Sequence, residues 1–253
     1  MSLKTEMSAV NIEKFISELD SFFSREDIEG AGFCLLKWHR LAAENGDKKG
    51  ELSILNEAVG YYRQTGEEEK GMKAVEDALA LIDELQLKNE KSAGTILLNC
   101  ATTMKSFGKV NEAMAYYDKA ENILTALLPL NDPLIAGLYN NKALAHQDIG
   151  EYEEAEMYFL KAISITSKSK ADALENAVSL VNLAHLYFDI DETDFRVNTL
   201  MEKAGEILKN PEYEGFPKYA FACRKCAPSF GYFGYFIDEK YLNEKADSIY
   251  AGN

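Results

Sequence analysis

The residues of this sequence that most readily suggest chemistry are a Cys-x-x-Cys pair and three histidines. Cys223 and Cys226 have the spacing of half a zinc site or of a redox pair. No second Cys-x-x-Cys pair occurs in the sequence, and no histidine lies near this one. His146 and His185 have no carboxylate or cysteine at ligand spacing, and His39 belongs to no pattern. The sequence therefore predicts neither a metal site nor a cofactor.

Acidic runs are a second chemical candidate, because paired carboxylates can carry out acid–base catalysis. The runs at 67–69 and 151–156 both follow a glycine turn and precede an apolar helical pattern. Carboxylates at that place match the dipole of the helix that they begin, which predicts a solvated surface. The sequence also has no GxSxG or HExxH motif and no glycine-rich phosphate loop. We therefore expect a protein without enzymatic activity.

One template of glycine, small and aromatic residues recurs through the chain and is clearest from 138 to 165. Around Gly150 as origin, its members are Tyr139, Ala143, His146, Ala155, Phe159 and Ala162. The equivalent origins are Gly66, Gly108, Asp191 and Gly234. Successive origins lie 42, 42, 41 and 43 residues apart. Each copy predicts two amphipathic helices joined by a tight turn, and a fixed period of this length is typical of a solenoid.

The cysteines fall on this template. Cys223 and Cys226 lie eleven and eight residues before their origin, and Cys100 lies eight before its own. These offsets are helix-packing positions, and a free cysteine behaves there as a small buried hydrophobe. His146 likewise occupies an offset that other copies fill with tyrosine, methionine or phenylalanine. We therefore expect all four side chains to be packed in the interior.

The order of small, aromatic and glycine positions resembles the tetratricopeptide repeat family, in the long-repeat type found in kinesin light chains. The resemblance covers about 51–207 clearly and 216–250 more loosely. It implies an all-α protein, a right-handed superhelical solenoid of helical hairpins. In such a solenoid the first helix of each repeat lines a concave groove that binds peptides or protein segments. The family resemblance specifies an architecture rather than an activity.

The resemblance also divides the chain into one continuous solenoid of about twelve helices. The predicted parts are an N-terminal helical pair or cap at 1–48, four repeats at 49–90, 91–131, 132–169 and 170–209, and a C-terminal pair at 210–253. The fourth repeat has Asp191 in place of the turn glycine and Arg196 at a usually small position, so its turn is predicted to carry an insertion. Pro217 is expected to begin the first helix of the last pair, and Pro228 to kink it.

Asparagine recurs nine residues before the origin of three repeats. The residues are Asn99, Asn141 and Asn182, and Lys225 fills the same offset in the last pair. Asparagine is a mediocre helix former, so its periodic use inside helices needs a reason. One interpretation is hydrogen bonding between repeats that sets the superhelical pitch. The other is that the amides bind the backbone of an extended peptide. The sequence leaves both open.

The same projection onto the implied groove predicts further lining residues. They are Arg63, Lys105, Asn140, Gln147, His185 and Arg224. The predicted groove contains four cations, which stand out because the whole chain has a net charge of −15: Arg63, Lys105, Arg224 and Lys225. We expect a groove less negative than the outer face, suited to a peptide with acidic side chains or a C-terminal carboxylate.

Composition limits the class of partner. The net charge of −15 opposes the phosphate backbone, so we expect no nucleic-acid partner. No apolar run is long enough to span a bilayer, so we expect no membrane association. Four cysteines are too few for a disulfide framework in 253 residues. These features predict a cytoplasmic protein.

The expected function is therefore a non-catalytic scaffold that binds a peptide or protein segment whose identity the sequence does not give. One alternative is a bacterial-style regulator in which a signalling peptide switches the solenoid between conformations. The 45 residues ahead of the repeats are short for the output domain of such a regulator and lack a basic character. A further alternative is a structural homo-oligomer or homodimer that associates through the aromatic segment 229–236.

Overall fold

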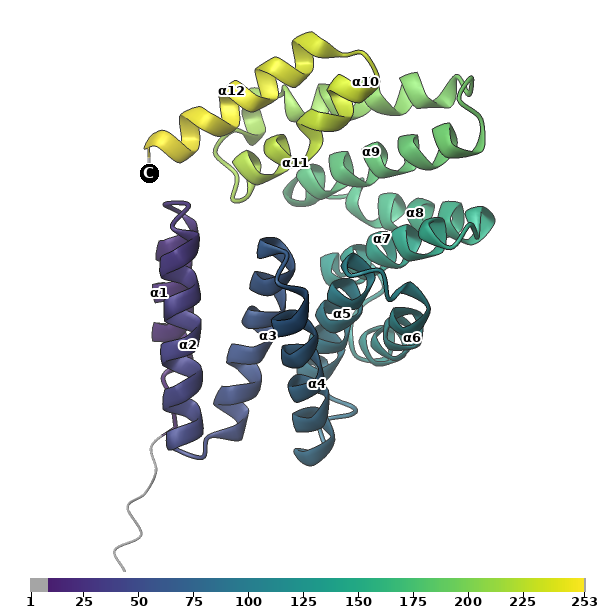
Figure 1. The fold of residues 1–253 in the computed structure, drawn as a ribbon. Helices are drawn as coiled ribbons and strands as arrows, with labels where there is room; N and C mark the ends of the chain where they lie inside the picture. Colours follow the sequence, from purple (N-terminus) through teal and green to yellow (C-terminus); the bar gives the residue numbers. More distant parts are fainter. Residues whose placement is uncertain (1–8, 253) are drawn as a thin grey trace, which may run out of the picture. The chain divides into compact units, whose positions relative to one another are not determined.

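A computed structural model describes residues 9–252, and every α-helix in this range pairs with a neighbour along the chain (Figure 1). The twelve helices described are α1 (Ile12–Phe23), α2 (Ile28–Glu44), α3 (Lys48–Thr65), α4 (Glu68–Glu84), α5 (Lys91–Ser106), α6 (Val110–Leu127), α7 (Pro133–Asp148), α8 (Tyr152–Thr166), α9 (Ala173–Ile190), α10 (Arg196–Leu208), α11 (Tyr219–Tyr232) and α12 (Phe236–Gly252). Short 3₁₀ turns at Lys170–Asp172 and Pro211–Tyr213 precede α9 and α11. The predicted all-α class built of helical hairpins is confirmed.

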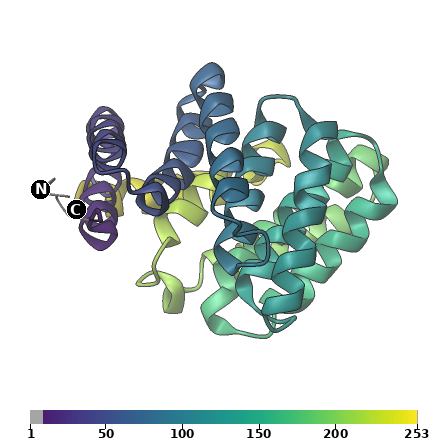
Figure 2. The same ribbon diagram turned by 90° about the horizontal axis from the view of Figure 1, so that it is seen from below.

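The chain divides into two compact units, one up to residue 124 and one from residue 125. Unit 1 holds α1 to α5 and most of α6, and unit 2 holds α7 to α12. Within unit 1, α1 lies beside α2 and α3 beside α4, as Figures 1 and 2 both show. Within unit 2, α7 pairs with α8, α9 with α10 and α11 with α12.

The turns of four hairpins require glycine for its backbone. Gly66, Gly108, Gly150 and Gly234 follow the first helices with φ between 73° and 85°. A side chain at Gly150 would meet no other atom within 4 Å, so the requirement is conformational rather than steric. The left-handed turn predicted at these origins is confirmed.

The fourth hairpin departs from this pattern as its sequence predicts. Asp191 ends α9 in an extended conformation with φ −152°, and five residues separate α9 from α10. One expectation for the last hairpin is corrected, because helix α11 begins at Tyr219 rather than at Pro217. Pro228 lies inside α11, which ends at Tyr232. Pro228 is exposed, so its ring lies at the surface of α11.

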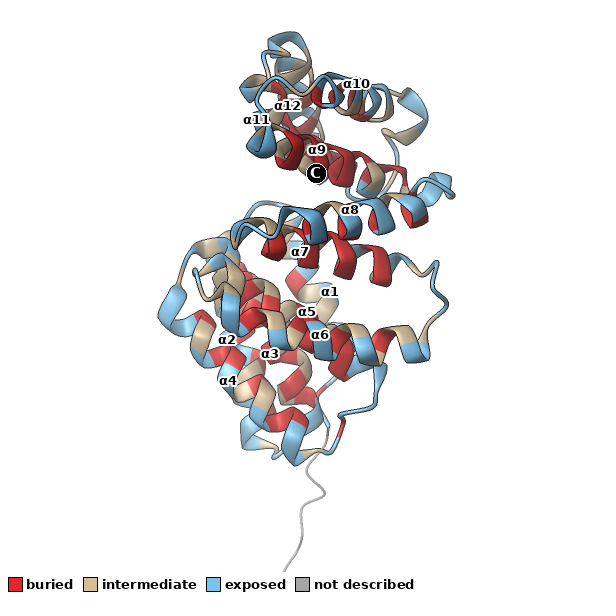
Figure 3. Ribbon diagram, turned by 90° about the vertical axis from the view of Figure 1, so that its right-hand side faces the viewer, coloured by how far each residue is buried: buried red, intermediate tan, exposed pale blue. Residues whose placement is uncertain are grey.

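Small residues lie at the positions where the helices of a hairpin pack together. Alanines seven residues before and twelve after the turn are fully buried in several hairpins, among them Ala101, Ala143, Ala184, Ala120 and Ala162. Figure 3 shows buried positions running along α7 and α9, while α8 shows exposed positions on its outer side. In unit 1, Trp38 and Phe15 pack with Ile54 of α3 in one cluster. The N-terminal pair therefore covers the first apolar face of the stack, as a cap is expected to do.

The turn conformation gives a direct stability prediction. Gly150→Ala should lower the free energy of unfolding by about 1–2 kcal/mol, because alanine is strained in the left-handed region. Gly137→Ala is the matched control. Gly137 lies inside α7 with open space around its Cβ position, so alanine there should raise stability by up to about 1 kcal/mol. Urea unfolding followed by circular dichroism measures both changes. Equal effects at the two sites would contradict this reading of the turn.

Candidate binding faces of the first helices

All ten predicted groove residues lie on the first helices of the hairpins. Unit 1 carries Arg63 on α3 and Asn99 and Lys105 on α5. Unit 2 carries the remaining seven on α7, α9 and α11: Asn140, Asn141, Gln147, Asn182, His185, Arg224 and Lys225. We call these surfaces the first-helix face of unit 1 and the first-helix face of unit 2.

On the face of unit 1, Asn99 takes part in a chain of amide and carboxylate groups. Its Nδ2 donates to Asn56 Oδ1 at 2.8 Å, and Asn56 Nδ2 donates to Glu57 Oε1 at 2.9 Å. Burial raises the pKa of Glu57. Asn56 and Glu57 were not among the residues predicted from the sequence. Glu57 lies nine residues before Gly66, at the offset that asparagine fills in other repeats, and Asn56 lies one residue earlier. This spacing is the signal by which the sequence could have indicated them.

Arg63 is the unusual group on this face. Its side chain is half-buried, its Nη1 atom is fully covered, and that atom has no hydrogen-bond acceptor among the described residues. Burial lowers the pKa of the Arg63 guanidinium, and the nearby Tyr117 opposes this effect. The Tyr117 hydroxyl itself donates to Thr102 Oγ1 at 3.2 Å. Lys105 occupies the same offset as Arg63 in the next repeat and is also half-buried.

On the face of unit 2, the asparagines are not equivalent. Asn182 Nδ2 donates to Asn140 Oδ1 at 3.0 Å, and Asn140 is only 8% exposed. In this pair and in the Asn99–Asn56 pair, the donor lies nine residues before the origin of its own repeat. The acceptor lies ten residues before the origin of the preceding repeat. The corresponding position for Asn141, ten residues before the origin of the preceding repeat, is Leu98, whose side chain has no hydrogen-bond acceptor. Asn141 is half-buried, and its amide has no hydrogen bond within the described part of unit 2.

Two more predicted residues of unit 2 tie neighbouring first helices together. Gln147 Nε2 on α7 donates to Asp189 Oδ2 on α9 at 2.6 Å. His185 Nε2 on α9 lies 2.8 Å from Ser229 Oγ on α11. Burial lowers the pKa of His185, against a smaller opposite effect of Asp189, so the neutral imidazole is favoured at neutral pH. Both side chains support the arrangement of the helices while one edge of each remains at the surface.

The two cations of α11 differ in their surroundings. Arg224 forms an ion pair of 2.7 Å with Asp247 on α12, so its charge is partly neutralised by its own hairpin. Lys225 is exposed and lies 5.9 Å above the centre of the Phe221 ring. Lys225 is therefore available to a ligand, whereas Arg224 must exchange its partner to bind one.

The segment 229–236 forms part of an aromatic cluster with α9. The rings of Tyr232 and Phe233 contact those of His185 and Phe188, with centroids 4.7 to 5.5 Å apart. Tyr232 remains 63% exposed, whereas Phe230 of the same segment is fully buried. Only part of the predicted aromatic contact is therefore free for a partner.

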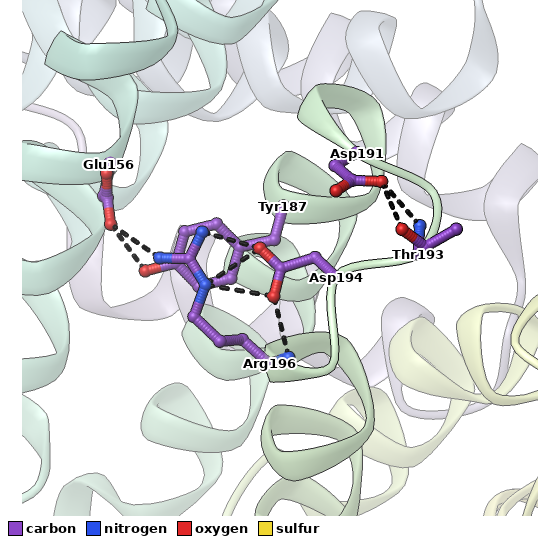
Figure 4. Close-up of polar contacts among 6 residues, drawn as sticks. All are labelled: Glu156, Tyr187, Asp191, Thr193, Asp194 and Arg196. Atoms are coloured by element: carbon purple, nitrogen blue, oxygen red, sulfur yellow. Dashed lines mark hydrogen bonds and ion pairs between the residues drawn. The ribbon is translucent and has the colours of Figure 1, made fainter.

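Arg196 closes the irregular turn between α9 and α10 (Figure 4). Its guanidinium stacks 3.6 Å from the centre of the Tyr187 ring and binds the Asp194 carboxylate at 2.6 Å. Tyr187 donates its hydroxyl to Glu156 on α8 at 2.6 Å. Arg196 occupies the position that is small in other repeats, and here it joins α8, α9 and α10 instead of allowing closer packing. We call Glu156, Tyr187, Asp194 and Arg196 the turn clasp.

The four cysteines are buried and unpaired by disulfides. Burial raises the pKa of Cys100 and Cys226 to about 12 and raises that of Cys223 as well. His146 is 8% exposed, with Nδ1 2.6 Å from Glu151 Oε2. The predicted interior positions are therefore confirmed. Among residues 9–252, no three potential metal-binding side chains come together.

Two clefts of unit 1 lie between successive second helices. One of about 470 Å³ is lined by α2, α3 and α4, with Leu36, His39 and Lys70 among its residues. The other, of about 420 Å³, is lined by Ile82, Leu97 and residues of α6.

None of the described helices is long and apolar enough to cross a membrane.

Comparison with known proteins gives a family match over one segment of the chain. Residues 134–194 match the family model of the tetratricopeptide repeat. No curated protein is similar enough in sequence to count as a match. The solved structures give the broader likeness, and at their low sequence identities this likeness shows the fold alone.

Three solved structures illustrate it. BtubC (BKLC) from P. vanneervenii superposes with a TM-score of 0.66 at 19% identity, over 81% of this chain and 82% of its own. A Rap protein complexed with Competence and Sporulation Factor gives 0.61 at 13%, over 93% and 73%. A protein of Podosopora anserina described as a kinesin light chain with nearly identical TPR-like repeats gives 0.52 at 18%, over 79% and 95%. The predicted resemblance to long tetratricopeptide repeats is confirmed.

The asparagine pairs can be tested by substitution. Asn182→Ala should lower the free energy of unfolding by about 1 kcal/mol, because it leaves the buried Asn140 carbonyl without its donor. Asn141→Ala, which breaks no such bond, should change stability by less than about 0.5 kcal/mol. Denaturant unfolding of both variants measures the difference. If Asn141→Ala destabilises as much as Asn182→Ala, the two residues are equivalent and this description is wrong.

The turn clasp predicts a dependence of stability on alkaline pH. Burial and the bond to Glu156 raise the pKa of Tyr187 from 10.0 to about 12. Its folded pKa lies above the unfolded one, so its contribution is complete below pH 10 and is lost as the pH rises towards 12. Tyr187→Phe should therefore be about 1 kcal/mol less stable than the unchanged chain at pH 8. The difference should shrink between pH 10 and 12. A difference that stays constant over that range would contradict the assignment.

Proposed function

We propose that this chain, a tetratricopeptide repeat protein, is an interaction scaffold whose first-helix face in unit 1 binds an acidic segment of a peptide or protein. The repeat type supports a role in binding other proteins. A structural neighbour, the Rap protein, has been solved with Competence and Sporulation Factor bound. The fold alone leaves the partner open, so the argument for an acidic segment rests on the side chains.

The observation that carries the proposal is the half-buried guanidinium of Arg63. Taking a charge out of water without pairing it costs free energy, and proteins usually supply a counter-ion. No carboxylate in the described part of unit 1 is paired with Arg63, although the chain has 42 acidic residues. A carboxylate from a ligand, approaching the part of the side chain that reaches the surface, would provide the missing charge. Lys105, at the same offset of the next repeat, would add to the attraction.

The proposal assigns no catalysis to the chain. The cysteine thiols are buried, and the raised pKa of Cys100 and Cys226 keeps them protonated at neutral pH. The imidazoles of His146 and His185 are held by contacts that join neighbouring elements. None of these groups forms a nucleophile–base pair at the surface.

A second candidate function is that of a regulator that senses a small signalling peptide. The likeness to the Rap structure over 93% of this chain favours it over the remaining alternative, a structural homo-oligomer. The two candidates make different demands on the protein. A scaffold keeps its conformation when it binds, whereas a switch changes its dimensions, which small-angle X-ray scattering with and without a bound peptide would detect.

The role of Arg63 is tested by selection from a displayed library of random twelve-residue peptides. Peptides enriched by the unchanged chain should contain aspartate, glutamate or a free C-terminal carboxylate. They should bind Arg63→Gln about tenfold or more weakly, which is the loss expected for one charge-assisted hydrogen bond. The unliganded Arg63→Gln chain should be at least as stable as the unchanged chain, because the substitution removes an unpaired, half-buried charge.

The matched control is Arg40→Gln. Arg40 is on α2 of the same unit, its side chain is 82% exposed, and it is paired with Glu44 of its own helix. This variant should bind the selected peptides as the unchanged chain does. Enriched peptides without acidic groups, or an equal loss in both variants, would overturn the proposal.

A further inference from the structure

The aromatic cluster of unit 2 exposes one ring, that of Tyr232, to the solvent, and its other rings pack against each other beneath it. Its members are His185 and Phe188 on α9, Tyr232 at the end of α11 and Phe233 directly after it. Each α9 ring contacts both the Tyr232 and the Phe233 ring, and these two rings meet edge to face with centroids 5.0 Å apart. The bond of His185 to Ser229 holds the His185 ring in place. Tyr232 is 63% exposed, so a partner can reach its ring.

Two carboxylates flank this cluster. Asp189 follows Phe188 directly, is exposed, and acts on the pKa of His185 through its charge. The second carboxylate is that of Glu239 on α12. A Cβ atom built on Gly231, the residue before Tyr232, would lie 2.5 Å from the Glu239 carboxyl group, which shows how closely that group approaches the chain. The nearest basic residue in sequence to Glu239, Lys240, is instead close to Glu244 at 3.7 Å.

We infer that the Tyr232 ring, together with Asp189 and Glu239, is a binding surface for an arginine side chain of a protein partner. A guanidinium stacks on an aromatic face and pairs with carboxylates at its edge, and this surface offers both. The inference rests on the proposed function only in treating the chain as an interaction scaffold. It concerns a different unit and the opposite charge from the Arg63 site.

The charges argue against a second copy of this chain as the occupant. In a two-fold symmetric dimer the same patch lies on both sides of the contact, which would bring Asp189 and Glu239 against their own copies. Each chain also has a net charge of −15, so association through an acidic rim would be opposed at low salt. A basic partner has the complementary charge.

The test uses arrays of immobilised nine-residue peptides, blocked at both ends, with randomised flanks and one fixed central residue. The central residue is arginine, its neutral isostere citrulline, or glutamate. The unchanged chain should be retained more by the arginine array than by the citrulline array. Tyr232→Ala and Glu239→Gln should each reduce this preference about two- to fivefold, the size of one exposed cation–π or ion-pair contact. Raising the salt concentration should reduce it further.

Phe221→Ala is the matched control, since Phe221 is another exposed aromatic residue of α11, 55% accessible and eleven residues before Tyr232. It should leave the preference unchanged. Circular dichroism should show all three variants folded, because Tyr232 and Glu239 are not buried. Equal retention by the arginine and citrulline arrays, or a preference that survives both Tyr232→Ala and Glu239→Gln, would overturn the inference.

The same arrays separate this inference from the proposed function. Arg63→Gln should lose glutamate-dependent binding and keep the arginine preference, and Tyr232→Ala should do the reverse. If the unchanged chain shows glutamate-dependent binding but retains the arginine and citrulline arrays equally, the Tyr232 surface is rejected and the Arg63 site is unaffected. Sedimentation velocity that shows a dimer of the unchanged chain, dissociated by Tyr232→Ala, would reject the arginine ligand in favour of self-association.

Discussion

The close approach of helices at small residues is the constraint on which each unit depends. Buried alanines recur at fixed distances before and after the turns, and their lack of bulk lets neighbouring helices pack at short range. The left-handed glycine between the helices sets the direction of return in the four hairpins that have it, so that the same positions meet in each of them. Once these contacts are made, the outward positions of the first helices are free to vary, and the candidate binding groups lie there.

Two polar features of unit 2, the turn clasp and Glu239, arise where the template is broken. Five residues after the turn, Ala113 and Ala155 are fully buried, but the last two hairpins carry Arg196 and Glu239 at this place. Arg196 builds the turn clasp on Tyr187, and the Glu239 carboxyl group lies close to Gly231, the residue before Tyr232. Both side chains are too large and too polar for the interior, so they lie at the edge of their hairpins.

Periodicity predicted the architecture because turn glycines and buried alanines are demanded by local geometry, which a sequence displays directly. It placed the cysteines and His146 in the interior for the same reason. It did not predict that Asn182 binds Asn140 while Asn141 has no such partner, because that depends on which residue the preceding repeat offers. Nor could it show that Arg63 has no counter-ion among the described residues of unit 1. The absence of a carboxylate around one side chain is a property of the folded unit, not of spacing along the chain.

The most direct test of the account is hydrogen–deuterium exchange of the chain with and without an acidic peptide selected by it. The account places the ligand on the first-helix face of unit 1, so added protection should fall on α3 and α5, near Arg63 and Asn99. The competing location in this unit is the pair of clefts between the second helices. Protection concentrated on α2, α4 and α6, and weaker on α3 and α5 around Arg63 and Asn99, would contradict the central claim.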